Sequence, residues 1–257
     1  MEIITIPCLK DNYAYLLICK RSLEAAVVDP SEAIPVKKMV SQKKVRLTTI
    51  FNTHHHWDHV GGNKELLSEH PELKIFGHAS DKGRIPGQNI FLEKGDNVFF
   101  GKKKGLFIHN PGHTSGAVTY VFGKNAFTGD TMFAAGCGRI FEGSFSEMYD
   151  SINFQIGKLP KDTKIYFGHE YTENNLNFAN SIEPGNLEIK KKLTKARNLI
   201  SKGLFTTPTT LEEEVKTNPF LRCKSSEICH NIKSNDPKKN LSEKEVFKTL
   251  RELKDIY

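Results

Sequence analysis

The chain of 257 residues has little of what marks secreted and membrane proteins. Its five cysteines are an odd number without a CxxC pair, so we expect neither a disulfide framework nor a cysteine-based zinc site. No apolar run approaches the roughly 18–20 residues that a membrane-spanning helix needs. The first residues, MEIITIPCLKDNYAYLLICKRS, lack the basic start, apolar run and cleavage site of a signal peptide. We therefore expect a cytoplasmic protein without a membrane partner.

The net charge of +7 is unevenly distributed along the chain. Residues 1–189 contain 21 basic and 21 acidic side chains, whereas residues 190–257 contain 16 basic and 9 acidic ones. A basic segment favours an anionic partner, such as a nucleic acid, an acidic membrane surface or a small anion. The alternative is a solvated, lysine-rich helical surface. Composition alone leaves both interpretations open.

Up to about residue 169 the sequence predicts short strands, because apolar segments rich in β-branched and aromatic residues alternate with turns. The predicted strands are 2–7, 13–19, 25–29, 47–52, 74–79, 105–110, 117–123, 125–130 and 164–169. Several are apolar on both sides, which indicates sheets that are covered on both faces. Helices are predicted at 33–44, with Ser31 as the candidate N-cap, at 61–70 and at 146–157.

The pattern becomes helical after about residue 171. Helices are predicted at 172–182, 186–203, 210–218 and 241–257, and the polar segment 224–240 is predicted to be a loop. The predicted organisation is therefore a mixed α/β domain over residues 1–170, followed by a smaller helical domain over residues 171–257.

The sequence THHHWDH places four histidines and an aspartate within seven positions. Side chains two apart on an extended segment point the same way, so His54 and His56 can converge on one point while His55 faces away. Asp58 and His59 follow at the turn and can face a second, neighbouring point. Imidazole and carboxylate are the ligands that Zn²⁺ and similar ions accept. The alternative, an incidental surface histidine run, fits badly because the cluster directly follows an apolar strand.

Three distant residues at strand ends are candidates to complete such a site. They are His113 in HNPGHTSGAV, Asp130 in FTGDTMF and His169 in YFGHEYT. Each alone is ambiguous, since a single histidine at a strand end is often structural and an aspartate in TGDT can cap a turn. Together, and in this order, they form a specific pattern.

The segments THHHWDH, PGHTSG, TGDTMF and FGHEYT together resemble the metallo-β-lactamase superfamily. A narrower similarity, to its glyoxalase II or hydroxyacylglutathione hydrolase family, rests on CGRIFEG, GHEYTENNLNFA, NPFLR and RELKD and spans the whole chain. The resemblance implies an α/β fold, a four-layer αββα sandwich with a smaller C-terminal helical domain. It also implies a binuclear metal site at one edge of the two sheets.

The resemblance assigns roles to individual residues of the predicted site. One divalent ion is expected to bind the three histidines His54, His56 and His113. The other is expected to bind Asp58, His59 and His169, with Asp130 bridging both ions, and His55 matches no ligand position. Zn²⁺ is the expected metal, and iron and manganese are alternatives that the same ligands tolerate.

The resemblance also implies a substrate site to which the C-terminal helical domain contributes. The residues at positions where the family contacts the glutathione moiety are Arg139, Tyr171, Arg251 and Lys254. Phe141 stands where some members have a substrate-contacting tyrosine, so a polar contact from that side is missing. A glutathione thioester is a net anion, which gives the basic segment a use: Arg251 and Lys254 could hold a carboxylate.

The activity that the resemblance implies is hydrolysis of S-2-hydroxyacylglutathione thioesters, above all S-D-lactoylglutathione, in the second step of methylglyoxal detoxification. Metal binding can lower the pKa of water from about 15.7 to about 7. A metal-bridging hydroxide, acting with the catalytic carboxylates of Asp58 and Asp130, is then expected to attack the thioester carbonyl. The thiolate leaves without a strong acid, because the pKa of a free thiol is about 8.5.

Three other functions compete with this one. Another hydrolase of the same fold could act on RNA, a lactone or a β-lactam, but the positive charge lies in a terminal segment and not along a groove, so no nucleic acid partner is expected. A mononuclear iron persulfide dioxygenase and a non-catalytic metal-binding module are both disfavoured by the presence of Asp58, His59 and His169. A monomer is expected, because the sequence has no obvious apolar interface stripe.

Overall fold

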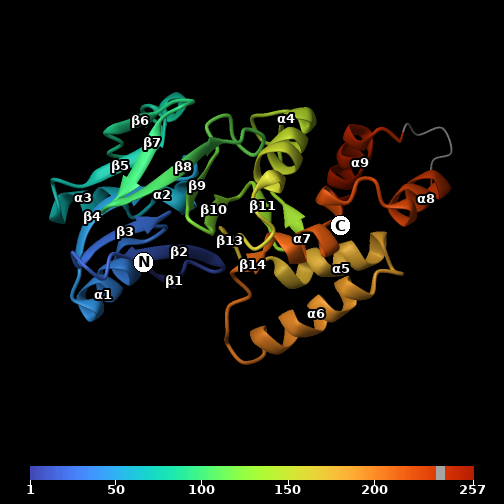
Figure 1. Ribbon diagram of the computed structural model, residues 1–257, viewed down its shortest axis with the longest axis horizontal. Helices are drawn as coiled ribbons and strands as arrows, with labels where there is room; N and C mark the ends of the chain where they lie inside the picture. The colour runs from blue at the N-terminus through green and yellow to red at the C-terminus, as the bar shows by residue number, and fades with distance from the viewer. Residues whose placement is uncertain (236–240) are drawn as a thin grey trace.

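A computed structural model describes residues 1–235 and 241–257. Two six-stranded sheets pack face to face within these residues, and helices lie outside them (Figure 1). The first sheet is formed by the N-terminal part of the chain, and the second mainly by its middle part. This four-layer αββα arrangement confirms the predicted fold class.

The first sheet begins antiparallel and continues parallel. Its strands, in spatial order, are β1 (Glu2–Cys8), β2 (Asn12–Ile18), β3 (Glu24–Val28), β4 (Arg46–Phe51), β5 (Lys74–His78) and β6 (Ile90–Leu92). The pairs from β3 to β6 are parallel and therefore need crossover connections. These connections contain α1 (Ala33–Lys43), α2 (Trp57–Val60), α3 (Asn63–Glu69) and the 3-10 turn η1 (Ala79–Asp81).

The second sheet is antiparallel except for one central pair. Its strands, in spatial order, are β14 (Thr209–Thr210), β13 (Lys164–Phe167), β10 (Asn125–Gly129), β9 (Val118–Phe122), β8 (Lys103–His109) and β7 (Asn97–Phe100), and β10 and β13 run parallel. A short ribbon, β11 (Met132–Phe133) and β12 (Gly136–Cys137), follows β10. Next comes α4 (Phe145–Asp150), continued by η2 (Ser151–Gln155) and η3 (Ile156–Lys158).

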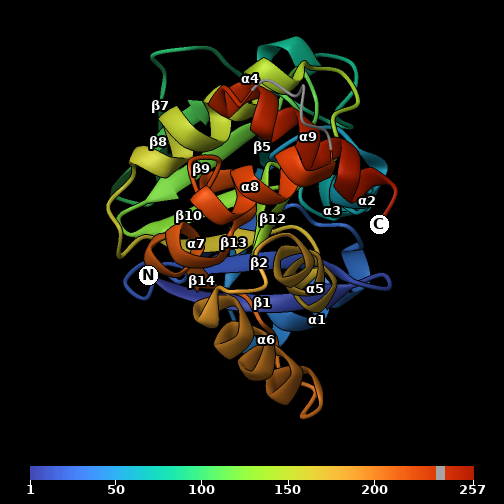
Figure 2. The same ribbon diagram turned by 90° about the vertical axis from the view of Figure 1, so that its right-hand side faces the viewer.

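The C-terminal part is helical and packs on the end of the sandwich (Figure 2). It contains α5 (Thr172–Ile182), α6 (Leu187–Ile200), α7 (Leu211–Thr217), η4 (Pro219–Leu221), α8 (Ser226–Asn235) and α9 (Glu243–Asp255). Because β14 from this part extends the second sheet, the helical part is joined to the sandwich by strand pairing as well as by packing. The division of the chain at residue 170 into two domains remains a prediction.

Three apolar layers stabilise the sandwich. Aromatic side chains from both sheets fill the space between them, among them Tyr15, Phe51, Tyr120, Phe127 and Phe167. On the outer face of the first sheet, Val36 of α1 and Leu66 of α3 pack against its strands. On the outer face of the second sheet, Met148 of α4 and Phe247 of α9 do the same. Strands covered on both faces, such as β2, are buried at every position, which explains their uninterrupted apolar sequences.

All the predicted strands are present, with ends shifted by one or two residues. Two predictions were wrong. Ser31 does not cap α1, because it lies two residues before the helix; Glu32 is the N-cap, with no side-chain cap bond among the described residues. Residues 226–235 of the predicted loop 224–240 form α8, because Ile228 and Ile232 lie one helical turn apart and are buried in the core of the second sheet. Residues 236–240 lie outside the described residues.

None of the helices formed by the described residues combines the length and the apolar character that a bilayer crossing requires.

Candidate metal centre

The predicted metal ligands meet at one edge of the sandwich, where strands of both sheets end. One group follows β4, and single residues follow β8, β10 and β13. Because β10 and β13 are parallel, their carboxyl ends lie at the same edge, where ligand sites of α/β folds concentrate. The residues brought together there are His54, His56, Asp58, His59, His113, Asp130 and His169.

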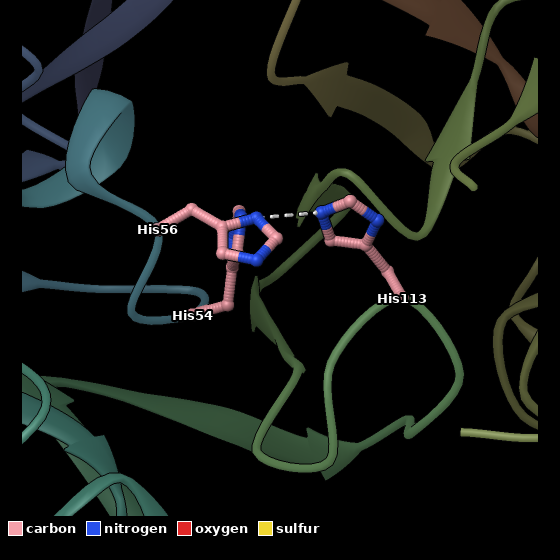
Figure 3. Close-up of side chains that lie close together, drawn as sticks. All are labelled: His54, His56 and His113. Carbon is pink, nitrogen blue, oxygen red and sulfur yellow. Dashed lines mark hydrogen bonds between the residues drawn. The ribbon is translucent and has the colours of Figure 1, made fainter. Parts of the chain in front are cut away.

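Three histidines form the first candidate ligand set, shown in Figure 3. Nδ1 of His56 lies 3.0 Å from Nε2 of His113, and the ring centroid of His54 lies 4.7 Å and 4.9 Å from theirs. Nε2 of His54 is buried and has no hydrogen-bond partner among the described residues. This buried nitrogen and the two neighbouring imidazoles provide three nitrogen donors, which is a set that a divalent cation accepts.

Asp58, His59 and His169 form the second candidate ligand set. Nε2 of His59 lies 3.2 Å from Nε2 of His169, which lies 3.3 Å from Oδ2 of Asp58. Asn12 donates from Nδ2 to the carbonyl and to Oδ2 of Asp58, both at 3.0 Å. This contact holds the carboxylate toward the two rings.

Asp130 lies between the two sets. Its Oδ1 is 3.3 Å from Nε2 of His59, and its Oδ2 is 3.5 Å from Nε2 of His113 and 3.3 Å from Nε2 of His169. The side chain is nearly buried, and Oδ1 has no hydrogen-bond partner by geometry among the described residues. A single carboxylate therefore faces ligands of both sets, as a bridging ligand must.

The other ring nitrogens are held from outside, and two of the residues that hold them, Asp29 and Asp11, were missed by the sequence analysis. Nδ1 of His59 lies 3.0 Å from Oδ2 of Asp29, and Nδ1 of His169 lies 2.9 Å from Oδ1 of Asp11. Nδ1 of His113 donates to the carbonyl of Arg139 at 2.7 Å. Such contacts set the tautomer and direct Nε2 inward. Asp29 could have been found, because it follows a strand as Asp130 does.

The pKa values of the histidines differ between the two sets, because burial dominates in the first set and nearby carboxylates dominate in the second. Burial keeps the pKa of His54 well below its usual range and lowers the pKa of His56 to about 4, so both are neutral at pH 7. Burial also opposes protonation of His59 and His169, but the neighbouring carboxylates together outweigh it: Asp130 with Asp29 at His59, and Asp130 with Asp58 and Asp11 at His169. They raise the two pKa values to about 10 and about 12. The second set therefore attracts a positive charge, and the residues present fit divalent metal ions.

Comparison with known proteins agrees with this geometry. Residues 11–169 match the metallo-beta-lactamase superfamily, and residues 170–257 match the family described as hydroxyacylglutathione hydrolase C-terminus. A hydroxyacylglutathione hydrolase of Nostoc sp. is 43% identical over 100% of both chains, and one of Gloeobacter violaceus is 43% identical over 97% of both. This chain belongs to the hydroxyacylglutathione hydrolase family.

Solved structures with the same fold extend beyond that family. BLEG-1 B3 metallo-beta-lactamase superposes with a TM-score of 0.66 at 21% identity and covers 86% of this chain and 99% of its own. ETHE1 from Myxococcus xanthus has a TM-score of 0.65 at 25% identity, with 92% of each chain covered. The first similarity shows the fold alone.

A cavity of about 630 Å³ opens beside the candidate metal centre of this hydroxyacylglutathione hydrolase family member. His113 and Asp130 form part of its wall. All the predicted substrate-binding residues line it: Arg139, Phe141, Tyr171, Arg251 and Lys254. The structure therefore brings the two predicted sites together, although Arg251 and Lys254 lie far from the predicted metal ligands in the sequence.

The two C-terminal cations of the cavity differ in their surroundings. Arg251 is 4% exposed; its Nη1 donates to the carbonyl of Cys137 at 2.7 Å and its Nη2 to Oδ1 of Asp255 at 3.1 Å. Lys254 is half-buried and contacts Oδ1 of Asn174. Burial, followed by the charge of Arg251, lowers the pKa of Lys254 to about 8. Arg251 thus supports the wall, while Lys254 is the more available cation.

Two aromatic rings flank the ligands at the cavity. The ring of Tyr171 stacks on His169 at 4.8 Å, and the ring of Phe141 packs edge-on against His56 and His113 at 5.6 Å and 5.3 Å. Phe141 is 63% exposed, so it presents an apolar surface to the cavity. Because residue 141 is a phenylalanine and not a tyrosine, no hydroxyl group faces the cavity from this position.

Proposed function

We propose that this chain hydrolyses S-2-hydroxyacylglutathione thioesters, chiefly S-D-lactoylglutathione to D-lactate and glutathione. One observation carries the proposal: a cavity lined by Arg139, Arg251 and Lys254 opens onto the wall that contains His113 and Asp130. An anionic small molecule held by those cations would have its reacting group at the ligand cluster. The similarity to full-length proteins named hydroxyacylglutathione hydrolase supports this substrate class.

We assign two divalent metal ions to the two ligand sets, with Asp130 shared between them. Zn²⁺ suits imidazole and carboxylate ligands, and iron or manganese would be tolerated. Bound there, the ions would supply a water whose pKa is about 7 instead of about 15.7, and positive charge for an anionic transition state.

The carboxylates of Asp58 and Asp130 would both be ionised at neutral pH, as metal binding requires. The pKa of Asp58 lies below its usual range, because His169, His59 and Asn12 together outweigh the opposing effect of burial. Asp58 therefore stays ionised at neutral pH, so its Oδ2, which faces His59 and His169, would be available as a ligand of the second ion. Asp130 is ionised for a similar reason, since His59 and His169 outweigh its burial. Two carboxylates thus leave the site with a net positive charge when two divalent ions are present.

The cavity would hold the glutathione moiety. Glutathione carries two carboxylates and one ammonium group, so a cationic wall favours it. Lys254 would contact a carboxylate directly, Arg139 lies exposed at the mouth, and Arg251 keeps the wall in place. The rings of Phe141 and Tyr171 would exclude water from the reacting carbonyl. The thiolate product needs no strong acid, because the pKa of its thiol is about 8.5.

The alternatives find less support. RNA binding would need basic side chains along a groove, whereas Arg139, Arg251 and Lys254 gather at one cavity. A mononuclear iron dioxygenase would leave the second ligand set without a role. The proposal therefore includes a monomeric enzyme of the cytoplasm that acts on a small molecule, without a nucleic acid or membrane partner.

The test is a lactoylglutathione hydrolysis assay with metal content measured before and after chelation. We expect two ions per chain, loss of hydrolysis after chelation and recovery when metal is added back. His169→Ala should lose metal and activity, while His109→Ala, which changes a histidine outside the ligand sets, should keep both. Parallel assays with RNA, a lactone, a β-lactam and a glutathione persulfide test the alternatives. A metal-loaded protein that hydrolyses no glutathione thioester would contradict the proposal.

A further inference from the structure

Arg84, in the connection between β5 and β6, reaches the rim of the metal centre without belonging to either ligand set. Its Nη1 and Nη2 donate to the two carboxylate oxygens of Glu142 at 3.0 Å and 2.9 Å. Its Nε and Nη2 also donate to Oδ1 of Asp81, at 3.1 Å and 2.8 Å. Asp81 is fully buried, so its contacts with Arg84 fix the position of the guanidinium group that also binds Glu142.

Glu142 extends this contact to the loop that carries His113. Its Oε2 accepts hydrogen bonds from the backbone N–H and the hydroxyl of Ser115, at 2.9 Å and 2.8 Å. The neighbouring backbones are paired as well: Phe141 donates to the carbonyl of His113 at 3.1 Å, and Gly143 donates to the carbonyl of Gly112 at 3.2 Å. The Glu142 carboxylate therefore binds the loop that carries His113, and the backbone beside it holds Phe141 against the same loop.

His55 joins the same group from the segment between β4 and α2. Its Nδ1 lies 2.6 Å from Nη2 of Arg84, and because a guanidinium only donates, Nδ1 is the acceptor. Its Nε2 lies 3.4 Å from Oε1 of Glu142. His55 stands between His54 and His56 in the sequence but points away from the ligands. His55 therefore contacts Arg84 and Glu142 and is not placed to bind a metal ion.

We propose that Arg84 and Glu142 form a clamp that positions the ligand set His54, His56 and His113, together with Phe141, for metal binding. The clamp joins four segments far apart in the sequence: the one after β4, the connection between β5 and β6, the loop between β8 and β9, and the loop after β12. A bidentate arginine–carboxylate pair defines geometry as well as distance. Asp29 and Asp11 hold the second ligand set from elsewhere, so the clamp acts on the first set.

An ordinary surface ion pair is the alternative, since the two side chains are 35% and 28% exposed. Such pairs contribute little to stability. Three features distinguish this pair: both arms of the fork are used, the buried Asp81 anchors it, and a backbone N–H of the ligand loop depends on it. Arg84 also holds the pKa of Glu142 at about 2, so the contact persists over the working pH range.

Metal titration tests the clamp, which rests on the proposed two-metal site. Metal-free parent, Arg84→Gln and Glu142→Gln are titrated with Zn²⁺ against a chromophoric chelator. His113→Ala and His169→Ala identify which binding step belongs to which ligand set. Because residues that orient metal ligands typically contribute about 10- to 100-fold to metal affinity, both clamp variants should lose that factor at the first set only. Arg46→Gln, which removes a surface contact of 2.8 Å to Glu24, should leave both affinities unchanged.

Amide hydrogen exchange of the metal-free protein gives a second measurement that does not depend on activity. The amides of Ser115, Phe141 and Gly143 should exchange faster in both clamp variants, and the double variant should match the single ones. Unchanged metal affinity with unchanged exchange would overturn the clamp. Equal losses at both ligand sets, with a lower melting temperature of the metal-free protein, would also overturn it. A parent that binds two ions but hydrolyses no thioester would contradict the proposed function and leave the clamp standing.

Discussion

Asp29 and His59 are joined by a buried contact: Oδ2 of the carboxylate lies 3.0 Å from Nδ1 of the imidazole. The same carboxylate accepts hydrogen bonds from the backbone N–H and the hydroxyl of Thr53, at 2.7 Å and 2.6 Å. Asp29 at the end of β3 therefore holds the end of β4, where the histidine cluster begins, and aims Nε2 of His59 at Asp130. A residue outside both ligand sets thus sets the direction of one ligand.

Replacing Asp29 by asparagine should weaken metal binding at the second ligand set. Asparagine tolerates the left-handed backbone of this position, whose φ is 48°, so the change removes an acceptor without adding strain. We expect about 10- to 100-fold weaker binding of the second ion and about 1–3 kcal/mol lower stability of the metal-free protein. Dialysis with metal analysis and urea unfolding measure the two effects. Asp96→Asn, in an exposed turn, is the control; parent-like metal affinity of Asp29→Asn would refute the assignment.

The two neighbours His55 and His56 should respond differently to alanine substitution. His56→Ala removes a ligand of the first set and should lose its metal ion and nearly all hydrolysis. His55→Ala should keep both ions and hydrolysis within about threefold, because Arg84 retains its bidentate contact with Glu142. Metal analysis and kcat/KM for both variants provide the measurement. Loss of an ion from His55→Ala would contradict this prediction.

Lys254 and Arg251 should contribute to substrate binding in different ways. Lys254→Ala should raise KM about 5- to 10-fold with little change in kcat, because a half-buried cation that contacts a carboxylate contributes on the order of 1 kcal/mol. Arg251→Ala should also lower stability by about 1–3 kcal/mol, because the buried carbonyl of Cys137 loses its donor. Steady-state kinetics and urea unfolding separate the effects. Lys248→Ala on the same helix is the control, and an unchanged KM in Lys254→Ala would exclude Lys254 as a substrate contact.

Local sequence patterns predicted what depends on local sequence. The strands follow from their apolar residues, and His113, Asp130 and His169 could be chosen because each follows a strand. Contacts between distant segments could not be chosen this way. Ile228 and Ile232 stand in a polar segment that became helical only because they pack against the core of the second sheet.

The same limit applies to the surroundings of the site. Arg84 lies in a polar connection without a recognisable motif, and its partner Glu142 is 58 residues away. The sequence also could not reveal that Arg251 is buried, since its acceptor, the carbonyl of Cys137, is 114 residues distant. Short sequence motifs contain the expected metal ligands. The groups that orient these ligands lie far away in the sequence and come close only through the packing of the two sheets.

Substrate affinity should depend on pH through Lys254. Burial, and then the charge of Arg251, lowers its pKa to about 8, so the side chain loses its positive charge as the pH rises through this value. Below pH 8 the cation is present and KM should be low, and above pH 8 the substrate carboxylate loses its partner and KM should rise by about 3- to 10-fold. Measuring KM for lactoylglutathione between pH 6.5 and about 9.5 shows this dependence, because Lys254 titrates within that range.

Lys254→Arg is the matched variant for this prediction. Arginine keeps its charge over the whole pH range, so the part of the KM rise that is due to Lys254 should disappear. The amino group of the substrate also titrates at alkaline pH, but it affects the parent and the variant equally, and the difference between the two profiles isolates Lys254. Superimposable profiles would mean that residue 254 does not contact the substrate carboxylate. A flat profile for the parent would mean that the substrate is held by Arg139 and Arg251 alone.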